Sequence, residues 1–295
     1  MSGSVAPEGS SLRGVGRFLE IQNLGLNLPF ALAFLFLAAH GLPRLLTVLL
    51  VVIAFVAARN AGHTFNRWVD RRLDAANPRT RDRALASGRT SPGLALGFCA
   101  ANSAVMVVAA YFLNPLAFVL APVALVLVLG YSYTKRVTSF TTAFLGLVQA
   151  ITPAAVFIAV EGTFPVVVLW AVGGLLAWGT AFETIHSLGD LESDRELGLF
   201  SVPLKWGIRR SVRLVFVLHA LALALLVVFG LELGLRLPYF LGLAAIAGLV
   251  AVTDRALAAR PTEPRVPFRR HFAMSLCYLA GTTLAVFVPV GPVLL

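Results

Sequence analysis

The sequence predicts an all-α integral membrane protein, a bundle of about nine transmembrane helices. Its 295 residues are 58% hydrophobic and only 13% charged, whereas soluble domains average about 45–50% apolar and about 25% charged residues. The apolar residues also gather in runs of about 17–25, the length a helix needs to cross a bilayer. These runs cover 24–41, 45–65, 92–112, 115–133, 140–160, 164–186, 212–231, 237–256 and 272–291.

Positive charge is concentrated in the loops of one membrane side. If the N-terminus is cytoplasmic, that side holds every Lys and Arg of the chain except Arg44 and Arg236. Because an excess of these residues marks cytoplasmic loops, we expect a bacterial-type inner (cell) membrane protein with its N-terminus and active site on the cytoplasmic side. The net charge of +10 then favours anionic membrane lipids or an anionic substrate, and no nucleic-acid motif is visible.

The N-terminal segment differs in composition from the rest of the chain. It is rich in Ser and Gly and has no apolar run before a cleavage site. We therefore expect a disordered tail over 1–15 and a single transmembrane domain over 16–295. Cys99 and Cys277 lie in predicted helices without CxxC spacing, which is typical of core residues. No obligate protein partner is inferred.

The first predicted helix begins near Asn23 and Asn27 and has Pro29 in its first turns. Proline is tolerated there because the early N–H groups have no partner within the helix. Asn23 and Asn27 could touch a substrate or bond to a neighbouring helix, and the second interpretation is favoured.

The second helix carries Asn66, Asp70 and Asp74 at its cytoplasmic end. Because they stand at i, i+4 and i+8, these three side chains project from the same face of the helix. Two carboxylates and an amide can hold a hard cation, and Mg²⁺ held this way is usually completed by the phosphates of a substrate. The eight arginines of 59–89 would face those phosphates. The alternative is a solvated helix end whose acids pair with nearby arginines.

Asn and Ser next to proline mark the following helix ends. Asn77-Pro78 ends the second helix, since proline disfavours the helical region for the residue before it. Ser91-Pro92 opens the third helix with proline at an allowed early position. Asn114-Pro115 forms a tight, uncharged turn between the third and fourth helices.

The fourth and fifth predicted helices carry further polar residues. Tyr133 fits an aromatic residue at the membrane interface, and Lys135 and Arg136 fall on the same membrane face as the aspartates. The fifth helix carries Gln149 and Pro153. Because proline frees backbone carbonyls in a membrane helix, we expect a kink that lines a cavity.

The sixth helix is expected to run without a break through 178–194. Glu183, Asp190 and Asp194 stand at i, i+7 and i+11, and so return to nearly the same face. An acid near membrane depth is costly and marks function. His186 could be a metal ligand, but a hydrogen bond to Asp190, four residues on, is favoured.

The two aspartate pairs are separated by four helices, so the second and sixth helices run in the same direction. This spacing predicts two pseudo-repeats of four helices plus one. Four carboxylates at one mouth would repel each other, and a divalent metal with an anionic ligand removes that repulsion. A rival hypothesis is a transporter of a phosphorylated anion, although many transporters are built on inverted repeats.

Four ordered motifs carry a resemblance to a known family. They are N-x-x-x-D-x-x-x-D at Asn66–Asp74, N-P-R-T-x-x-R-x-L-x-x-G at Asn77–Gly88, Y-x-Y-x-K-R at Tyr131–Arg136 and D-x-x-x-D-x-x-x-G at Asp190–Gly198. With them the chain resembles the UbiA superfamily of membrane prenyltransferases, and most of all its 4-hydroxybenzoate polyprenyltransferase-like branch. The departures are Ala86, where the family usually has proline, and Glu183 and His186, where aspartate and tyrosine are common.

The resemblance implies Mg²⁺-dependent transfer of a polyprenyl group from its diphosphate to an aromatic acid. That acceptor would be 4-hydroxybenzoate or a hydroxynaphthoate, a precursor of ubiquinone or menaquinone. The candidate metal ligands are Asn66, Asp70, Asp74, Asp190 and Asp194, of which the four aspartates are catalytic. The candidate substrate contacts are Asn66, Arg71, Arg83, Tyr131, Lys135, Arg136 and Glu183. Which acceptor is used stays open.

Overall fold

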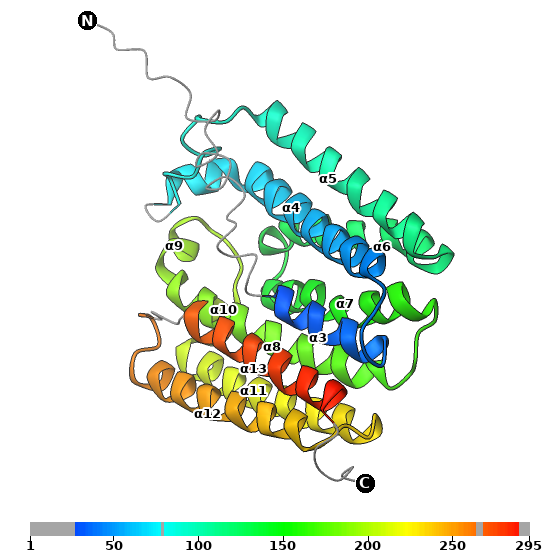
Figure 1. Cartoon of the computed structure of the whole chain (residues 1–295). Helices are drawn as coiled ribbons and strands as arrows, with labels where there is room; N and C mark the ends of the chain where they lie inside the picture. Colours follow the sequence, from blue (N-terminus) through cyan, green and yellow to red (C-terminus); the bar gives the residue numbers. More distant parts are fainter. Residues whose placement is uncertain (1–26, 78–79, 264–267, 289–295) are drawn as a thin grey trace, which may run out of the picture.

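The structure, a computed structural model, is a bundle of long helices (Figure 1). It describes residues 27–77, 80–263 and 268–288. The long helices in these ranges are α3 (Leu28–Ala38), α4 (Leu45–Ala76), α5 (Pro92–Leu113), α6 (Pro115–Gly130), α7 (Thr141–Glu161), α8 (Val168–Gly189), α11 (Ile208–Glu232), α12 (Leu237–Ala259) and α13 (Phe268–Phe287). The short ones are η2 (Tyr131–Arg136), α9 (Leu191–Glu196) and α10 (Val202–Trp206). The predicted all-α membrane bundle is confirmed.

Within the described ranges, 7 helices are long and apolar enough to cross a membrane. Two of the nine predicted spans do not meet that measure. The helix predicted over 24–41 is described only as the 11-residue α3, which ends before His40 and Gly41, both at positive φ. α13 begins at Phe268 rather than at 272, so its first turn takes in Arg269 and Arg270. The predicted tail over 1–15 and Asn23 lie outside the described residues.

The helix boundaries follow the signals in the sequence. The Ser91 hydroxyl accepts from the Leu94 N–H at 3.2 Å, and the Asn114 carboxamide oxygen accepts from the Ala117 N–H at 2.9 Å. Each cap precedes a proline in the first turn of its helix. α4 ends at Ala76, because Asn77 takes an extended backbone at ψ 121° before Pro78. These boundaries confirm the predicted starts and stops.

The prediction of a continuous helix over 178–194 is wrong at Asp190. α8 ends at Gly189, and Asp190 (φ −97°, ψ 4°) separates it from α9. Glycine weakens a helix interior, and aspartate favours helix ends because its side chain competes for backbone groups. The chain nevertheless stays in a helical turn there, since the Asp194 N–H donates to the Asp190 carbonyl at 2.8 Å.

Close packing between α7 and α8 depends on two glycines. A Cβ added to Gly146 would stand 2.4 Å from the Thr180 Oγ1, and one added to Gly179 would stand 2.9 Å from the Gly146 Cα. Small residues let the backbones of membrane helices approach in this way. The crossing brings Gln149 of α7 against Glu183 of α8. The main core lies among α3, α7, α8, α11, α12 and α13.

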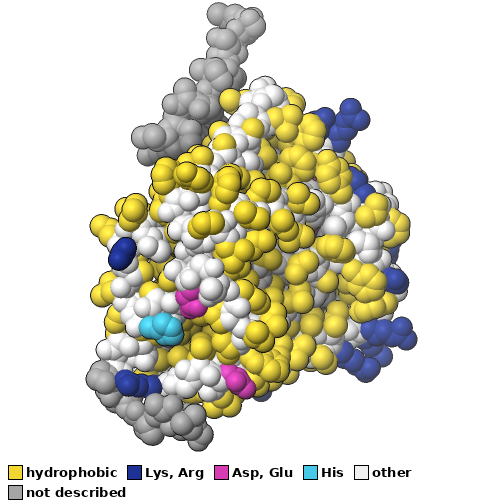
Figure 2. Space-filling view, turned by 90° about the vertical axis from the view of Figure 1, so that its right-hand side faces the viewer, with side chains coloured by type: hydrophobic (Ala, Val, Ile, Leu, Met, Phe, Trp, Pro, Cys, Tyr) yellow, Lys and Arg dark blue, Asp and Glu magenta, His cyan; other side chains and the backbone are white. Residues whose placement is uncertain are grey.

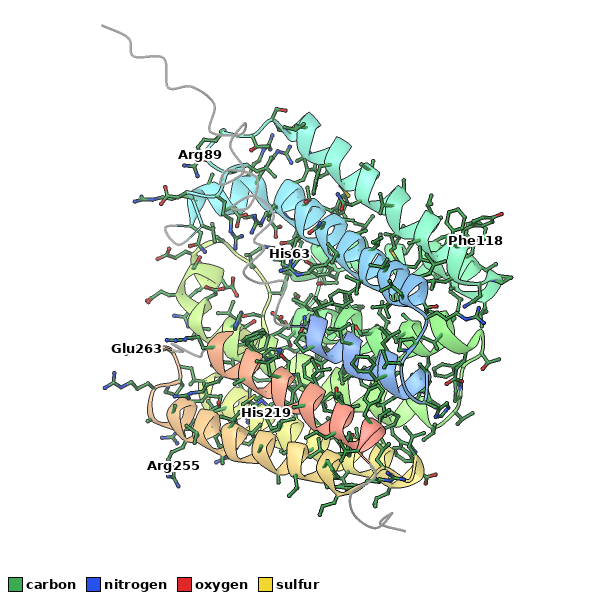
Figure 3. The ribbon with its side chains drawn as sticks, viewed as in Figure 1. His63, Arg89, Phe118, His219, Arg255 and Glu263 are labelled. Atoms are coloured by element: carbon green, nitrogen blue, oxygen red, sulfur yellow. The ribbon has the colours of Figure 1, made fainter. Side chains whose placement is uncertain are left out.

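The surface fits a bilayer environment. Large apolar side chains such as Leu42, Val126 and Val166 are exposed on it, and Figure 2 shows one face covered mostly by hydrophobic side chains. Arg89, Arg255 and Glu263 lie at one end of the bundle and Phe118 at the other (Figure 3). The loops that follow α4 and α8 are both at the first of these ends (Figure 1), so the two helices run in the same direction, as predicted.

Candidate active site

A cavity of about 1110 Å³ lies among α4, α6, α7 and α8, with α5 contributing at one end. Acidic, basic and amide side chains line the end next to the basic loops. Mostly apolar side chains line the rest of it, together with a few polar ones such as Asn27 and Thr152. Nine of the candidate site residues from the sequence line this cavity: Asn66, Asp70, Asp74, Arg83, Tyr131, Lys135, Glu183, Asp190 and Asp194.

One wall of the polar end is the stripe on α4. Asp70 and Asp74 are buried, and the Asn66 amide donates to the Asp70 Oδ2 at 3.1 Å. The predicted i, i+4, i+8 spacing therefore does place the three side chains on one face. Arg59, His63 and Arg67 continue this stripe into the cavity. Arg59 and Arg67 are two of the eight arginines of 59–89 that were expected to face phosphates. His63 was not predicted, although its helical spacing from Asn66 and Asp70 could have indicated it.

Cations from two other segments reach these aspartates. The Lys135 Nζ lies 2.5 Å from the Asp70 Oδ2 and an Arg136 guanidinium nitrogen lies 2.8 Å from the Asp70 Oδ1. The Arg83 guanidinium donates to both Asp74 oxygens at 3.0 and 3.1 Å. The Asp70 side chain is only 3% exposed, and a buried carboxylate needs such partners because its desolvation is costly.

The loop after α4 is tied to both aspartate motifs. The Thr80 hydroxyl donates to the Asp74 carbonyl at 3.0 Å, and the Asn77 amide donates to the Ser193 hydroxyl of α9 at 2.7 Å. The Phe200 N–H, beyond α9, donates to the Lys135 carbonyl at 3.0 Å. These bonds join the polar segments that follow α4, α6 and α8 into one assembly around the mouth of the cavity.

The opposite wall comes from α8 and α9. Glu183, Asp190 and Asp194 all line the cavity, although the helix breaks between the first and the last of them. The Gln149 amide donates to a Glu183 carboxylate oxygen at 3.2 Å. His186 also lines the cavity, and its ring lies against Phe182, with 4.4 Å between the ring centroids.

Two predicted diphosphate contacts stand apart from the cavity lining. The Arg71 guanidinium donates to the Trp68 carbonyl at 2.7 Å and lies 5.0 Å from the centroid of the Trp68 ring. The structure therefore does not bring Arg71 to the cavity, because Arg71 falls on a different face of α4 from Asp70 and Asp74. Arg136 contacts Asp70 and also donates to the backbone carbonyls of Val69 and Ser132.

Asn27 makes the interhelical contact that the sequence favoured. Its side-chain oxygen lies 3.4 Å from the His271 Nε2 of α13, and both residues line the cavity. His271 stands 244 residues from Asn27 and belongs to none of the motifs. Nothing in the sequence pattern could have pointed to it.

The oxygen atoms that line the cavity suit the predicted Mg²⁺ as a metal that binds together with substrate phosphates. The described ranges contain no group of three or more His, Cys, Asp or Glu side chains that could hold a metal unaided. They do present two carboxylate pairs on facing walls of one cavity. Because Mg²⁺ is usually bound by one or two carboxylates together with substrate phosphates, these residues suit a metal that arrives with a diphosphate better than a metal held by protein alone.

Comparison with known proteins identifies the same family in sequence and in structure. The model of the UbiA prenyltransferase family matches residues 27–291. A 4-hydroxybenzoate octaprenyltransferase from Nitrosospira multiformis is 34% identical over 226 residues, which are 77% of this chain and 78% of that protein. The enzyme of the same name from Shewanella woodyi is 30% identical over 231 residues, 78% of this chain and 80% of that protein.

Solved structures share the fold. The apo structure of a UbiA homolog from Aeropyrum pernix superimposes with a TM-score of 0.79 at 27% identity, covering 91% of this chain and 98% of that one. A UbiA homolog from Archaeoglobus fulgidus, solved with DMAPP and Mg²⁺ bound, has a TM-score of 0.73 at 18% identity, covering 92% and 99%.

Proposed function

This chain belongs to the UbiA prenyltransferase family and is an aromatic prenyltransferase, and we propose that it moves a polyprenyl group from a polyprenyl diphosphate to 4-hydroxybenzoate or a hydroxynaphthoate in respiratory quinone biosynthesis. One observation carries the proposal. Two carboxylate pairs and the basic residues Arg59, Arg67, Arg83 and Lys135 face one cavity, and most of the remaining lining is apolar. Such a cavity has a place for each part of a donor that joins a charged diphosphate to a hydrocarbon chain.

The diphosphate would bind at the polar end. Asp70 and Asp74 on one wall, with Asp190 and Asp194 on the other, would hold Mg²⁺ together with the phosphate oxygens, and Asn66 adds an amide oxygen. Bound there, Mg²⁺ would supply charge neutralisation for the departing diphosphate. The A. fulgidus homolog was solved with DMAPP and Mg²⁺ bound, which supports the proposal that a diphosphate donor and Mg²⁺ bind together.

Lys135 and Arg83 would change partners when the donor binds. Each now pairs with an aspartate, and each lines the cavity. Phosphate oxygens can take over these charge-assisted hydrogen bonds, which frees the aspartates for the metal. Fixed cations aimed at the place where negative charge develops lower the barrier to C–O cleavage.

The transfer itself is a substitution at the allylic carbon. The bond from that carbon to the diphosphate oxygen breaks, and its electron pair leaves with the diphosphate. The carbon then bonds to an electron-rich ring carbon beside a hydroxyl, and that ring carbon loses its proton to the released diphosphate, which restores the aromatic ring. Apolar helix walls keep water away from the allylic cation. Glu183, held by Gln149, lies in the lining where the acceptor would approach.

An acceptor panel tests the proposal. Purified protein in detergent or lipid is given 4-hydroxybenzoate, a dihydroxynaphthoate or benzoate with a prenyl diphosphate, and the products are read by mass spectrometry. We expect product with at least one hydroxylated acid in Mg²⁺ or Mn²⁺ and none in excess chelator. Benzoate is the matched control, because without the hydroxyl its ring is less electron-rich. Full turnover in chelator, or no product with any acceptor, would contradict the proposal.

We also propose that the polar end faces the cytoplasm of a cell with a bacterial-type inner membrane. The basic loops share one end of the bundle (Figure 3), in keeping with the excess of positive charge in cytoplasmic loops. In a cysteine-free background, cysteines placed at Ser87 and Thr262 should react with an impermeant reagent from the cytoplasmic side only. A cysteine at Glu232 should react from the other side. The reverse pattern would place the site outside.

A further inference from the structure

A second, much smaller cavity lies beside the large one. Its volume is about 20 Å³, and Phe182 and His271 line both cavities. The other side chains around it come from α8, α11, α12 and α13, and the polar ones among them are those of Trp178, His219, Thr253 and Arg270. His271 therefore stands between the active-site cavity and a small, partly polar space inside the helix bundle.

Trp178 lines this small cavity and carries a buried donor. Its side chain is 5% exposed, and its indole Nε1 has no hydrogen-bond partner in the described part of the chain. The centroid of its ring lies 5.6 Å from that of His219 and 5.7 Å from that of His271. Because a buried donor without an acceptor is destabilising, an acceptor placed in the small cavity would remove that cost.

The two histidines beside Trp178 each have one ring nitrogen in use. His219 lies inside the bundle (Figure 3), and its Nδ1 is 2.8 Å from a carboxylate oxygen of Asp254 on α12. The Nε2 of His271 lies 3.4 Å from the side-chain oxygen of Asn27. Both partners are acceptors, so each neutral ring carries its proton on the nitrogen that faces them. The second nitrogen of each ring, Nε2 of His219 and Nδ1 of His271, is then an acceptor.

We propose that the small cavity holds one water molecule that bridges Trp178, His219 and His271. A buried water needs at least about 10–15 Å³ and about two to four polar partners, and this cavity supplies both. The water accepts from the Trp178 indole and donates one hydrogen to the second nitrogen of each histidine. One donor and two acceptors are satisfied together by the single molecule that can serve all three.

The water makes His271 a positioning residue for the transfer reaction, a role that rests on the proposed function. By donating to Nδ1, it keeps the His271 proton on Nε2, which donates to the Asn27 oxygen. The Asn27 amide nitrogen is then left as a donor for the large cavity, which both residues line. An N–H₂ group suits an oxygen of the aromatic acceptor. Without the water, His271 can carry its proton on Nδ1, and the Asn27 amide turns over and offers an acceptor instead.

Two substitutions of Thr253 test the water site directly. Thr253 is buried and lines the small cavity, and its hydroxyl donates to the Leu249 carbonyl at 2.8 Å. Thr253→Val leaves the space open, whereas Thr253→Ile adds one more methyl group and fills it. In ¹⁵N-labelled protein we expect a nuclear Overhauser effect between water and the Trp178 indole N–H in the wild type and in Thr253→Val, but not in Thr253→Ile. The chain has 4 tryptophans, and Trp178→Phe identifies the resonance.

Steady-state kinetics of the same pair test the effect on the acceptor. Thr253→Ile should raise the KM for the aromatic acid by about tenfold relative to Thr253→Val, the size expected for one lost hydrogen bond. The kcat and the KM for the prenyl diphosphate should stay near the wild-type values. Asn27→Asp keeps the size of the side chain but removes the amide donor, and it should raise the same KM by about tenfold or more. A general disturbance of packing would instead change kcat and both KM values.

The outcomes separate this inference from the proposed function. If the wild type transfers no prenyl group to any acceptor, the proposed function fails, while the Overhauser measurement still decides the water site. No effect between water and the Trp178 indole in the wild type would overturn the water site. If the water is present but Thr253→Ile keeps the acceptor KM of Thr253→Val, the role given to His271 and Asn27 is overturned.

Discussion

The two aspartate pairs have the same spacing in the sequence but different surroundings in the molecule. Asp70 and Asp74 lie on the unbroken α4, are buried, and pair with cations from η2 and from the loop after α4. Asp190 stands at the break between α8 and α9, Asp194 lies within α9, and both are only half-buried. The first pair is deeply buried and contacts cations from two other segments. The second pair stands at an interruption of the helix and is less deeply buried.

This difference indicates that the two aspartate pairs have different roles in one site. The α4 pair is preorganised, because ion pairs at 2.5 to 3.0 Å already fix its carboxylates. The α8–α9 pair sits on a short helix that the Asn77–Ser193 bond ties to the loop after α4. We expect the first pair to set where the metal and diphosphate bind, and the second pair to complete the site from the facing wall.

The largest effect should come from removing one charge in each pair. Asp70→Asn and Asp190→Asn should each lower kcat by about a hundredfold to a thousandfold, the range for losing one preorganised electrostatic group. If both pairs serve one metal–diphosphate cluster, the double variant should be little worse than the poorer single one, as for residues that act as a unit. Rates of transfer at saturating Mg²⁺ measure this. Effects that multiply in the double variant would show that the pairs act independently.

A smaller effect is expected at the cations of the first pair. Lys135→Gln should raise the KM for the prenyl diphosphate by about tenfold to a hundredfold, because a hydrogen bond to a charged group contributes about 1.5–3 kcal/mol. The KM for the aromatic acceptor should stay near the wild-type value. Arg71→Gln is the control, since Arg71 packs on Trp68 and not on the cavity. A matching rise in Arg71→Gln would contradict this placement of the diphosphate.

The stability of the two pairs should also differ. Asp70→Asn should lower the midpoint of thermal unfolding in detergent, since it removes the charged partner of Lys135 and Arg136 at a site where the carboxylate is only 3% exposed. Asp190→Asn should change that midpoint less, because Asp190 is half-buried. The measurement is made without metal, so that binding does not contribute. A larger shift in Asp190→Asn would reverse the assignment of the preorganised pair.

The smallest effect belongs to an acid beside the second pair. Glu192 lies between Asp190 and Asp194 in the sequence, but its side chain is exposed and does not line the cavity. Glu192→Gln should change kcat/KM by no more than about twofold, as surface substitutions away from special features have small effects. Steady-state rates with both substrates test this. A loss as large as that of Asp190→Asn would mean that negative charge on α9, rather than ligand geometry, is what matters.

Much of the architecture was decided by local patterns in the sequence. Apolar runs and proline-flanked caps placed α4, α5, α6, α7 and α12 to within a few residues, apart from the charged turns that extend α4 beyond its apolar run. The helical period alone put Asn66, Asp70 and Asp74 on one face. These inferences succeed because hydropathy, capping and helical spacing involve residues only a few positions apart. The break at Asp190 is the exception, where a glycine and an aspartate outweighed the period.

Only the tertiary structure decided which residues share the site. Lys135 and Arg136 reach Asp70 from more than 60 positions away, and Asn77 meets Ser193 across 116 positions. Gln149 meets Glu183 because Gly146 and Gly179 let two helices touch. Arg71 is not part of the site because it projects from another face of α4, and the apolar part of the cavity is lined by residues of α4, α6 and α7. Such pairings depend on how helices pack, and no spacing along a single chain encodes which helix faces will meet.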